Sequence, residues 1–118
     1  MTFTTKRVYE EPSADDGFRV LIDRLWPRGL RKDAAALDLW LKDVAPSSDL
    51  RRWWNHDAAR MEEFAERYRA ELTDSPALDE LRDAGRDHDQ VTLLYAAHDP
   101  AVNHARILLE VLLDRAGD

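Results

Sequence analysis

Two short apolar runs, far apart in the chain, constrain the fold more than any other feature. Val20-Leu21-Ile22 is the centre of a strand-like segment, Phe18–Leu25, and a second such segment covers Gln90–Ala97. Continuous apolar runs bounded by charged and turn-forming residues are typical of strands buried on both faces of a parallel sheet. Helical patterns fill the interval between them, as a crossover between parallel strands requires. We therefore expect an α/β fold with a small, mostly parallel sheet covered by helices.

The rest of the chain supplies a further strand and the helices. Thr2–Tyr9, rich in Thr, Val and aromatic residues, predicts a first strand, which gives a sheet of three to four strands. The spacing of Leu37, Trp40, Leu41 and Val44 predicts an amphipathic helix that ends at Pro46. Further helices are predicted from four candidate caps: Ser47 or Ser48 (through Trp54), Asp57, Ser75-Pro76 (to about Gly85) and Asn103.

Length and composition narrow the class of protein. The 118 residues contain no linker or repeat, so we expect a single domain over 1–118. The net charge of −7 makes nucleic-acid binding unlikely, and no apolar run is long enough to span a membrane. The chain has no cysteine, which excludes disulfides, thiolate nucleophiles and thiolate-bound metals. The first residues lack the apolar stretch of a secretory signal, so we expect a cytoplasmic protein.

Polar side chains follow both central strands, and they predict a site. Asp23, Arg24, Trp26 and Arg28 follow the first apolar run, whereas Tyr95 ends the second, with Asn103 and His104 at the next helix start. Ligands of open parallel sheets bind at the carboxyl ends of the strands, and a helix N-terminus favours anions. We predict that Arg24, Arg28 and Asn103 bind an anion there, and that Asp23 and His104 transfer protons. Trp26, Tyr95 and His56 are predicted to line the pocket.

Each of these residues also has a structural interpretation. Arg24 is as well suited to a structural ion pair with Asp23 or Asp38 as to anion binding. Arg28 follows a proline in a turn, where its side chain can simply remain solvated. Trp26 and Tyr95 are typical packing residues, His56 has the position of a residue flanking a cap, and Asn103 has that of a helix cap. A buried His104 bonded to a loop carbonyl is as plausible as a catalytic one.

Several sharper signatures are absent from the sequence. It contains no Gly-x-Gly-x-x-Gly, no His-Glu-x-x-His and no Gly-x-Ser-x-Gly motif, so we predict neither a cofactor nor a metal.

The adjacent Trp53 and Trp54 cannot both face the same side of a helix. This doublet suggests a surface for a homodimer or, equally well, a pair wrapped under a neighbouring loop.

Five segments together resemble a known family. They are Arg19–Leu30 with its Asp-Arg-Leu-Trp-Pro-Arg-Gly run, Leu37–Ser47, His56-Asp57, Thr92–Ala97 and Asn103-His104-Ala105. In order and spacing they closely resemble the YeaO-like branch of the domain-of-unknown-function 488 family. The resemblance implies a small α/β protein from bacteria or archaea, with no established activity to transfer. Longer members carry cysteines in what look like the places of Tyr95-Ala96-Ala97 and Asn103-His104-Ala105, so a thiol mechanism does not carry over to this chain.

Three functions remain open on the sequence alone. The first is a protein that binds, or acts on, a small anion such as a nucleotide or a phosphorylated metabolite. The second is a protein-interaction or structural module without enzymatic activity. The third is a weak nucleic-acid binder that uses local basic residues, namely Arg28, Arg31, Lys32, Arg51 and Arg52. Whether the chain is an enzyme stays open.

Overall fold

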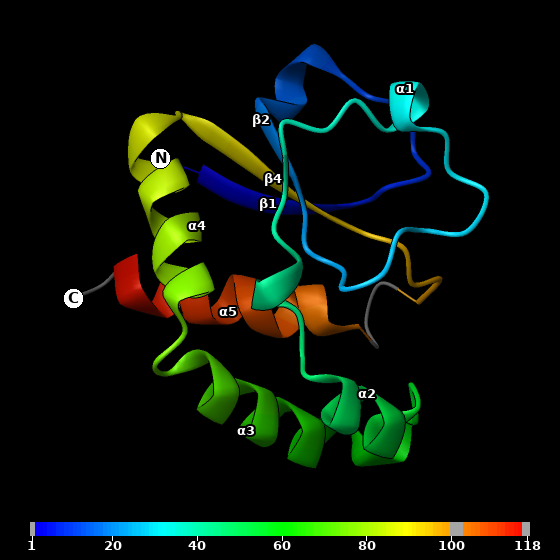
Figure 1. The fold of residues 1–118 in the computed structure, drawn as a ribbon. Coiled ribbons are helices and arrows are strands. Elements are labelled where there is room, and N and C mark those ends of the chain that lie inside the picture. The colour runs from blue at the N-terminus through cyan, green and yellow to red at the C-terminus, as the bar shows by residue number, and fades with distance from the viewer. Residues whose placement is uncertain (1, 100–102, 117–118) are drawn as a thin grey trace.

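A four-stranded parallel sheet forms the centre of the computed structural model, which describes residues 2–99 and 103–116 (Figure 1). The strands are β1 (Thr2–Arg7), β2 (Phe18–Leu21), β3 (Leu39–Trp40) and β4 (Gln90–Tyr95), in the spatial order β1-β4-β2-β3. The two apolar runs are neighbours, with Val20 opposite Leu93. The predicted fold class, a small parallel α/β sheet with helices, is confirmed.

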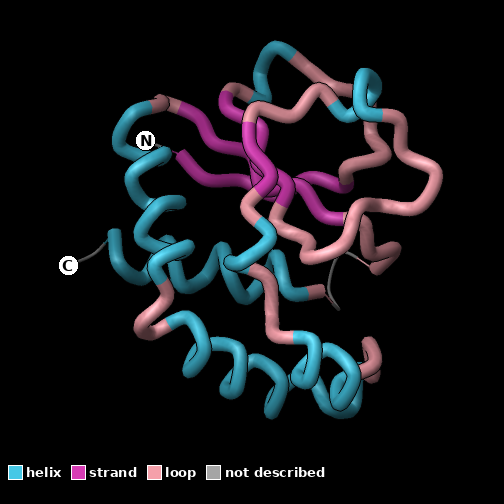
Figure 2. Tube along the Cα trace, viewed as in Figure 1, coloured by secondary structure: helices cyan, strands magenta, loops and turns pink. Residues whose placement is uncertain are grey.

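The long helices lie together on one side of the sheet (Figure 2). Helices α4 (Pro76–Asp87) and α5 (His104–Ala116) contact the strands, α3 (Met61–Leu72) packs on α5, and α2 (Ser48–Trp54) packs on α3. The short α1 (Lys32–Ala35) and the 3-10 turns η1 (Ala14–Asp16), η2 (Lys42–Val44) and η3 (Ala58–Arg60) complete the helical elements of the described residues. None of the described helices is long and apolar enough to cross a membrane.

Both faces of the sheet are buried, and each by different elements. Val20, Ile22 and Leu93 point into the large core under the helices. Leu21 and Leu94, which alternate with them, form a smaller core beneath the loop that joins β2 to β3. This double burial explains why the strand segments read as continuous apolar runs.

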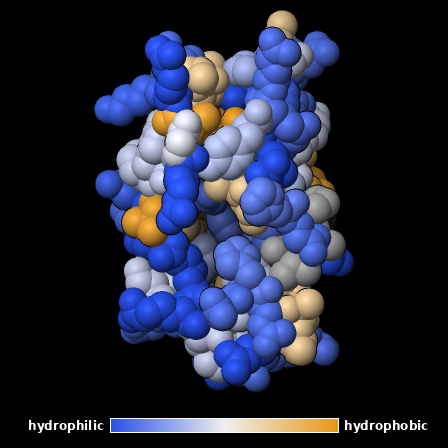
Figure 3. All heavy atoms as spheres, turned by 90° about the vertical axis from the view of Figure 1, so that its right-hand side faces the viewer, coloured by the Kyte–Doolittle hydropathy of each residue, from blue (hydrophilic) through white to orange (hydrophobic). Residues whose placement is uncertain are grey.

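The carboxyl ends of β1 and β4 meet on the side of the molecule that Figure 3 turns toward the viewer. Hydrophilic residues cover most of that face, and the apolar residues on it form small, separate patches. A polar surface at the carboxyl edge of a parallel sheet is where ligand sites of α/β proteins are found.

The predicted helix over residues 37–44 is wrong. Leu39 and Trp40 form the edge strand β3, and only Lys42–Val44 turns helically. The backbone of this segment bonds β2, with the Asp38 amide donating to the Arg19 carbonyl at 2.9 Å. The apolar residues divide between the two faces of the sheet, since Leu37 and Trp40 join the smaller core while Leu41 and Val44 join the larger one. The i, i+3, i+4, i+7 spacing of these apolar residues, which is typical of a helix, here belongs to a short strand followed by a turn.

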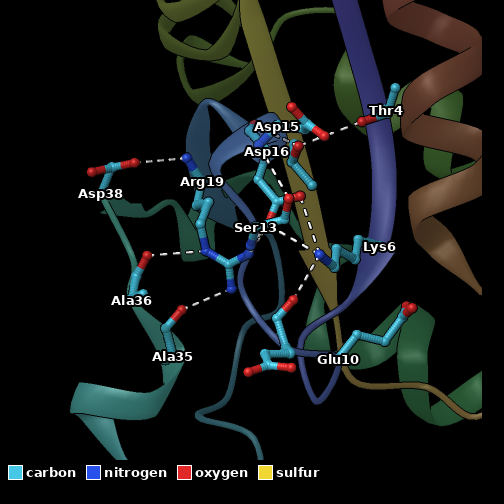
Figure 4. A network of polar contacts seen from close by, with 12 residues as sticks. Thr4, Lys6, Glu10, Ser13, Asp15, Asp16, Arg19, Ala35, Ala36 and Asp38 are labelled. Carbon is cyan, nitrogen blue, oxygen red and sulfur yellow. Dashed lines mark hydrogen bonds and ion pairs between the residues drawn. The ribbon is translucent and has the colours of Figure 1, made fainter.

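A buried ionic network fixes the loop between β2 and β3 (Figure 4). Arg19 pairs with Asp16 and donates to the carbonyls of Ala35 and Ala36 at 2.8 and 3.0 Å, while Lys6 bonds Asp16 at 3.1 Å. Burial alone would raise the pKa of Asp16, but hydrogen bonds from the backbone and from both cations outweigh it and lower the pKa. The network ties α1 to the sheet and so holds one end of the loop that forms a wall of the site below.

Candidate functional site

A cavity of about 580 Å³ lies where β2 and β4 end. It is bounded by residues 23–28 after β2, by Ala45 and Pro46, by α2 and the turn after it, by Ala96 and Ala97 after β4, and by the first residue of α5. The ionisable residues of its lining are Asp23, Arg24, Arg28, Arg51, Arg52, His56 and His104. Four arginines and one carboxylate residue therefore line the same space.

Asp23 joins the ends of the two central strands. The ladder between them continues to the Ile22 amide, which donates to the Leu94 carbonyl, and then the Asp23 side chain takes over. Its Oδ2 accepts from the Ala96 amide at 3.0 Å. Because a side chain replaces the backbone as the acceptor at this point, β2 ends at Leu21, earlier than the predicted Leu25. Oδ1 is buried and receives no hydrogen bond from the described residues. Burial raises the pKa of Asp23 in spite of the opposing charge of His104.

His104 lies next to Asp23 at the start of α5. Its Nε2 is 2.9 Å from the Ile22 carbonyl and 3.4 Å from Asp23 Oδ1. Because a carbonyl oxygen can only accept, Nε2 carries the proton and donates it to Ile22. Burial lowers the pKa of His104, which favours the neutral imidazole. The interpretation of His104 as a buried imidazole bonded to a loop carbonyl is confirmed, and the residue also lines the cavity; its role in proton transfer stays a prediction.

The arginines of the cavity differ in how far they are already engaged. Arg24 donates to the carbonyls of Ala45 and Pro46 at 3.2 Å each, and its nearest carboxylate is the exposed Asp43 at 3.8 Å, not Asp23 or Asp38. Arg52 is paired with the exposed Asp49.

Two of the arginines remain available. The exposed side chain of Arg28 has no ionic or hydrogen-bond partner among the described residues. Arg51 is half-buried, and its Nε is buried without a hydrogen-bond partner there. These two guanidinium groups are the free donors of the site.

Of the other predicted residues, two line the cavity and two do not. Trp26 lines it, with its indole N–H bonded to the Leu30 carbonyl, and so does the exposed His56 after α2. Tyr95 lies in the core under the helices instead. Asn103 is buried as the cap of α5, where its side chain accepts from the Arg106 amide and donates to the Asp99 carbonyl. The predicted cap is confirmed, and its amide is already engaged on both sides.

The sequence-based site omitted Arg51 and Arg52, which were considered only for nucleic-acid binding. Both lie on α2, whose position follows from Trp54: its ring is buried and stacks on Phe64 with the centroids 3.8 Å apart. Arg51 is three residues before Trp54 and so lies on a neighbouring part of the helix surface. That spacing was the available signal.

The tryptophan doublet is divided between the interior and the surface. Trp54 is 2% exposed, whereas Trp53 is half-buried between two cations. The guanidinium carbons of Arg60 and Arg67 lie 5.2 and 4.4 Å from the centre of the Trp53 ring. Only Trp53 reaches the surface on which a partner was predicted to dock.

Comparisons with known proteins give whole-chain matches. The family model DUF488-N3i, described as the inactive DUF488-N3 subclade, matches residues 2–118. The uncharacterized protein Rv3073c of Mycobacterium tuberculosis H37Rv is 50% identical over 110 residues, which cover 92% of each chain. The uncharacterized protein YeaO of Escherichia coli K12 is 39% identical over 113 residues, 95% of this chain and 97% of YeaO. No solved structure gives a significant match.

The described residues contain no group of three or more His, Asp or Glu side chains suited to a metal ion.

Proposed function

The chain belongs to the inactive DUF488-N3 subclade, and we propose that it binds a small anion, such as a nucleotide or a phosphorylated metabolite, in the cavity where β2 and β4 end. The observation that carries the proposal is the charge of the lining. Four arginines face one carboxylate in a chain whose net charge is −7. A concave surface of one charge, set in a protein of the other, concentrates ligands of the opposite sign.

The available donors suit a phosphate or a carboxylate. Arg28 and Arg51 approach the cavity from different elements, and a planar guanidinium can offer two parallel N–H groups to such an anion. Arg24 contributes charge while its hydrogen bonds hold the wall formed by Ala45 and Pro46. The volume of about 580 Å³ is within the range of small-molecule sites.

Two observations favour binding over turnover. The matching family model describes an inactive subclade. The proton on His104 Nε2 is already donated to the Ile22 carbonyl, so this atom is not free to accept one from a ligand. We therefore assign Asp23 and His104, which the sequence suggested as proton-transfer groups, to the shaping and polarity of the cavity floor.

The alternative functions have weaker support. For nucleic-acid binding, the net charge is unfavourable, and Arg31 and Arg52 are each paired with a neighbouring aspartate. For a protein-interaction surface built on the tryptophan doublet, the burial of Trp54 removes half of the expected contact. No specific feature favours either of them over anion binding.

The test is an equilibrium titration of the wild-type protein with phosphate, pyrophosphate, a nucleotide and a sugar phosphate. Binding is measured by calorimetry and by the shift in thermal unfolding. Losing one charge-assisted hydrogen bond costs about 1.5–3 kcal/mol, so Arg51→Gln should weaken binding at least about tenfold. Arg28→Gln should have a smaller effect, because its exposed side chain is screened by water.

Arg86→Gln is the matched control. Arg86 is an exposed arginine near the end of α4, before β4 begins, and it is paired with Asp83. It carries the same charge but does not line the cavity. Binding should be unchanged in this variant. Absence of binding in the wild type, or equal losses in Arg51→Gln and Arg86→Gln, would contradict the proposal.

A further inference from the structure

We propose that the cavity selects anions that also carry a hydroxyl group, and that Asp23 makes the selection by accepting a hydrogen bond from it. The inference rests on the proposed function and narrows it, from small anions in general to the class of hydroxylated anions. Sugar phosphates belong to this class, and bare phosphate does not.

The first step is the spare acceptor capacity of Asp23. A carboxylate can accept about four hydrogen bonds. Among the described residues the Asp23 side chain receives one, from the Ala96 amide to Oδ2. That bond holds the carboxylate in one orientation. The side chain lines the cavity and is 17% exposed, while Oδ1 itself is buried, so a ligand that fills the cavity meets the carboxylate at the exposed part of the side chain.

The second step is that the neighbours cannot use this capacity. His104 Nε2 is 3.4 Å from Oδ1, but its proton is directed to the Ile22 carbonyl at 2.9 Å. Arg51 and His56 act on Asp23 through their charge, without a hydrogen bond to it. The group that completes the hydrogen bonding of Asp23 must therefore come from outside the described residues.

The third step identifies the chemistry of that group. A second cation is disfavoured, because the Arg51 guanidinium already acts on the carboxylate through its positive charge. A second anion is repelled by it. A neutral donor remains, and a hydroxyl is the neutral donor commonly found on a small phosphorylated metabolite. The ligand would place its charge toward Arg28 and Arg51 and its hydroxyl toward Asp23.

The experiment compares two probes of equal charge and similar length, glycerol 3-phosphate and propyl phosphate, by calorimetric titration. Wild-type protein should bind glycerol 3-phosphate at least about tenfold more tightly, because a hydrogen bond to a charged group discriminates strongly against a ligand that lacks it. In Asp23→Asn this ratio should fall toward one. Propyl phosphate should bind the variant slightly more tightly than it binds the wild type, since a repelling charge is gone.

Asp83→Asn provides the matched control, because it removes an exposed carboxylate on α4, away from the cavity, and should leave the ratio unchanged. Thermal unfolding of each variant checks that it is folded. A wild-type ratio near one, or a ratio that persists in Asp23→Asn, would overturn the selection by Asp23 while leaving anion binding intact. If neither probe binds and phosphate and pyrophosphate also fail, the proposed function fails, and this inference fails with it.

Discussion

Replacing Asp23 by Asn should make the ligand-free protein more stable. The carboxylate is largely buried and receives one hydrogen bond, and burial raises its pKa although that hydrogen bond and the charge of Arg51 act in the opposite direction. The cost of desolvation therefore exceeds the gain from the neighbouring cations. Asn has the same shape, can accept the bond from the Ala96 amide through its carbonyl oxygen, and carries no charge.

The size of the effect follows from the exposure of the side chain. Asn removes the buried charge, but its amide nitrogen takes the place of Oδ1 and is also buried without a partner, so only the cost of desolvating the charge is relieved. Asp23 keeps 17% of its side chain exposed, so we expect a gain of only about 1 kcal/mol at pH 7. For a chain of this length that is an increase in melting temperature of about 4 °C.

The pH dependence separates this explanation from an accidental gain in packing. The folded-state pKa of Asp23 is above the ordinary value of 3.8, so the folded protein binds this proton more tightly than the unfolded chain does. The contribution of Asp23 to stability consequently falls as the pH rises from 3.8 through the folded-state pKa. The advantage of Asp23→Asn should vanish below pH 3.8 and be complete above the folded-state pKa.

Urea unfolding of wild type, Asp23→Asn and the Asp83→Asn control across this pH range measures the effect. The control should follow the wild type. If Asp23→Asn is instead less stable at pH 7, and the deficit grows as the pH rises, then attraction to His104 and Arg51 outweighs desolvation. The reasoning about the cavity floor would then be refuted.

Three further variants test the fold, all by urea unfolding. Gly17→Ala should cost about 3 kcal/mol or more, because φ is +63° and a Cβ would lie 2.4 Å from the Gln90 carbonyl oxygen; Gly29→Ala, with φ +74° and nothing within 4 Å, should cost about 1–2 kcal/mol. Equal losses would mean that the close approach to Gln90 does not matter. Tyr68→Phe should cost about 1–2 kcal/mol, because the buried hydroxyl donates to the Val44 carbonyl at 2.6 Å; no loss would mean that this carbonyl finds another donor.

The central strands could be predicted from the sequence because each is buried on both faces. Val20-Leu21-Ile22 and the run around Leu93 are apolar at successive positions, a pattern that a surface helix does not produce. The segment 37–44 could not be predicted in the same way. An i, i+3, i+4 spacing also arises when a short strand divides its apolar residues between two faces and a turn follows. Only the pairing with β2 distinguishes the two cases.

The candidate site was predictable where it depends on the ends of strands. Asp23 comes shortly after β2, His104 begins the helix that follows β4, and both line the cavity. Tyr95 was misplaced, although the sequence held the correction: strand side chains alternate, so Tyr95 shares the face of Leu93 under the helices. Arg51 depends on how α2 docks through Trp54 on Phe64, and its spacing from Trp54 does not by itself say that this part of the helix faces the ends of β2 and β4.

The Asp23–His104 pair shows how a cavity can keep acid–base residues and still be suited to binding alone. Asp23 Oδ2 holds the Ala96 amide after β4, and His104 Nε2 holds the Ile22 carbonyl after β2. Together they tie the ends of both central strands to the start of α5. A group that transfers protons must be free to change its hydrogen-bond partners, whereas these two atoms are needed where they are. Asp23 Oδ1 has no hydrogen-bond partner among the described residues, but it is buried, so we expect a ligand to meet this pair at the exposed part of the Asp23 side chain.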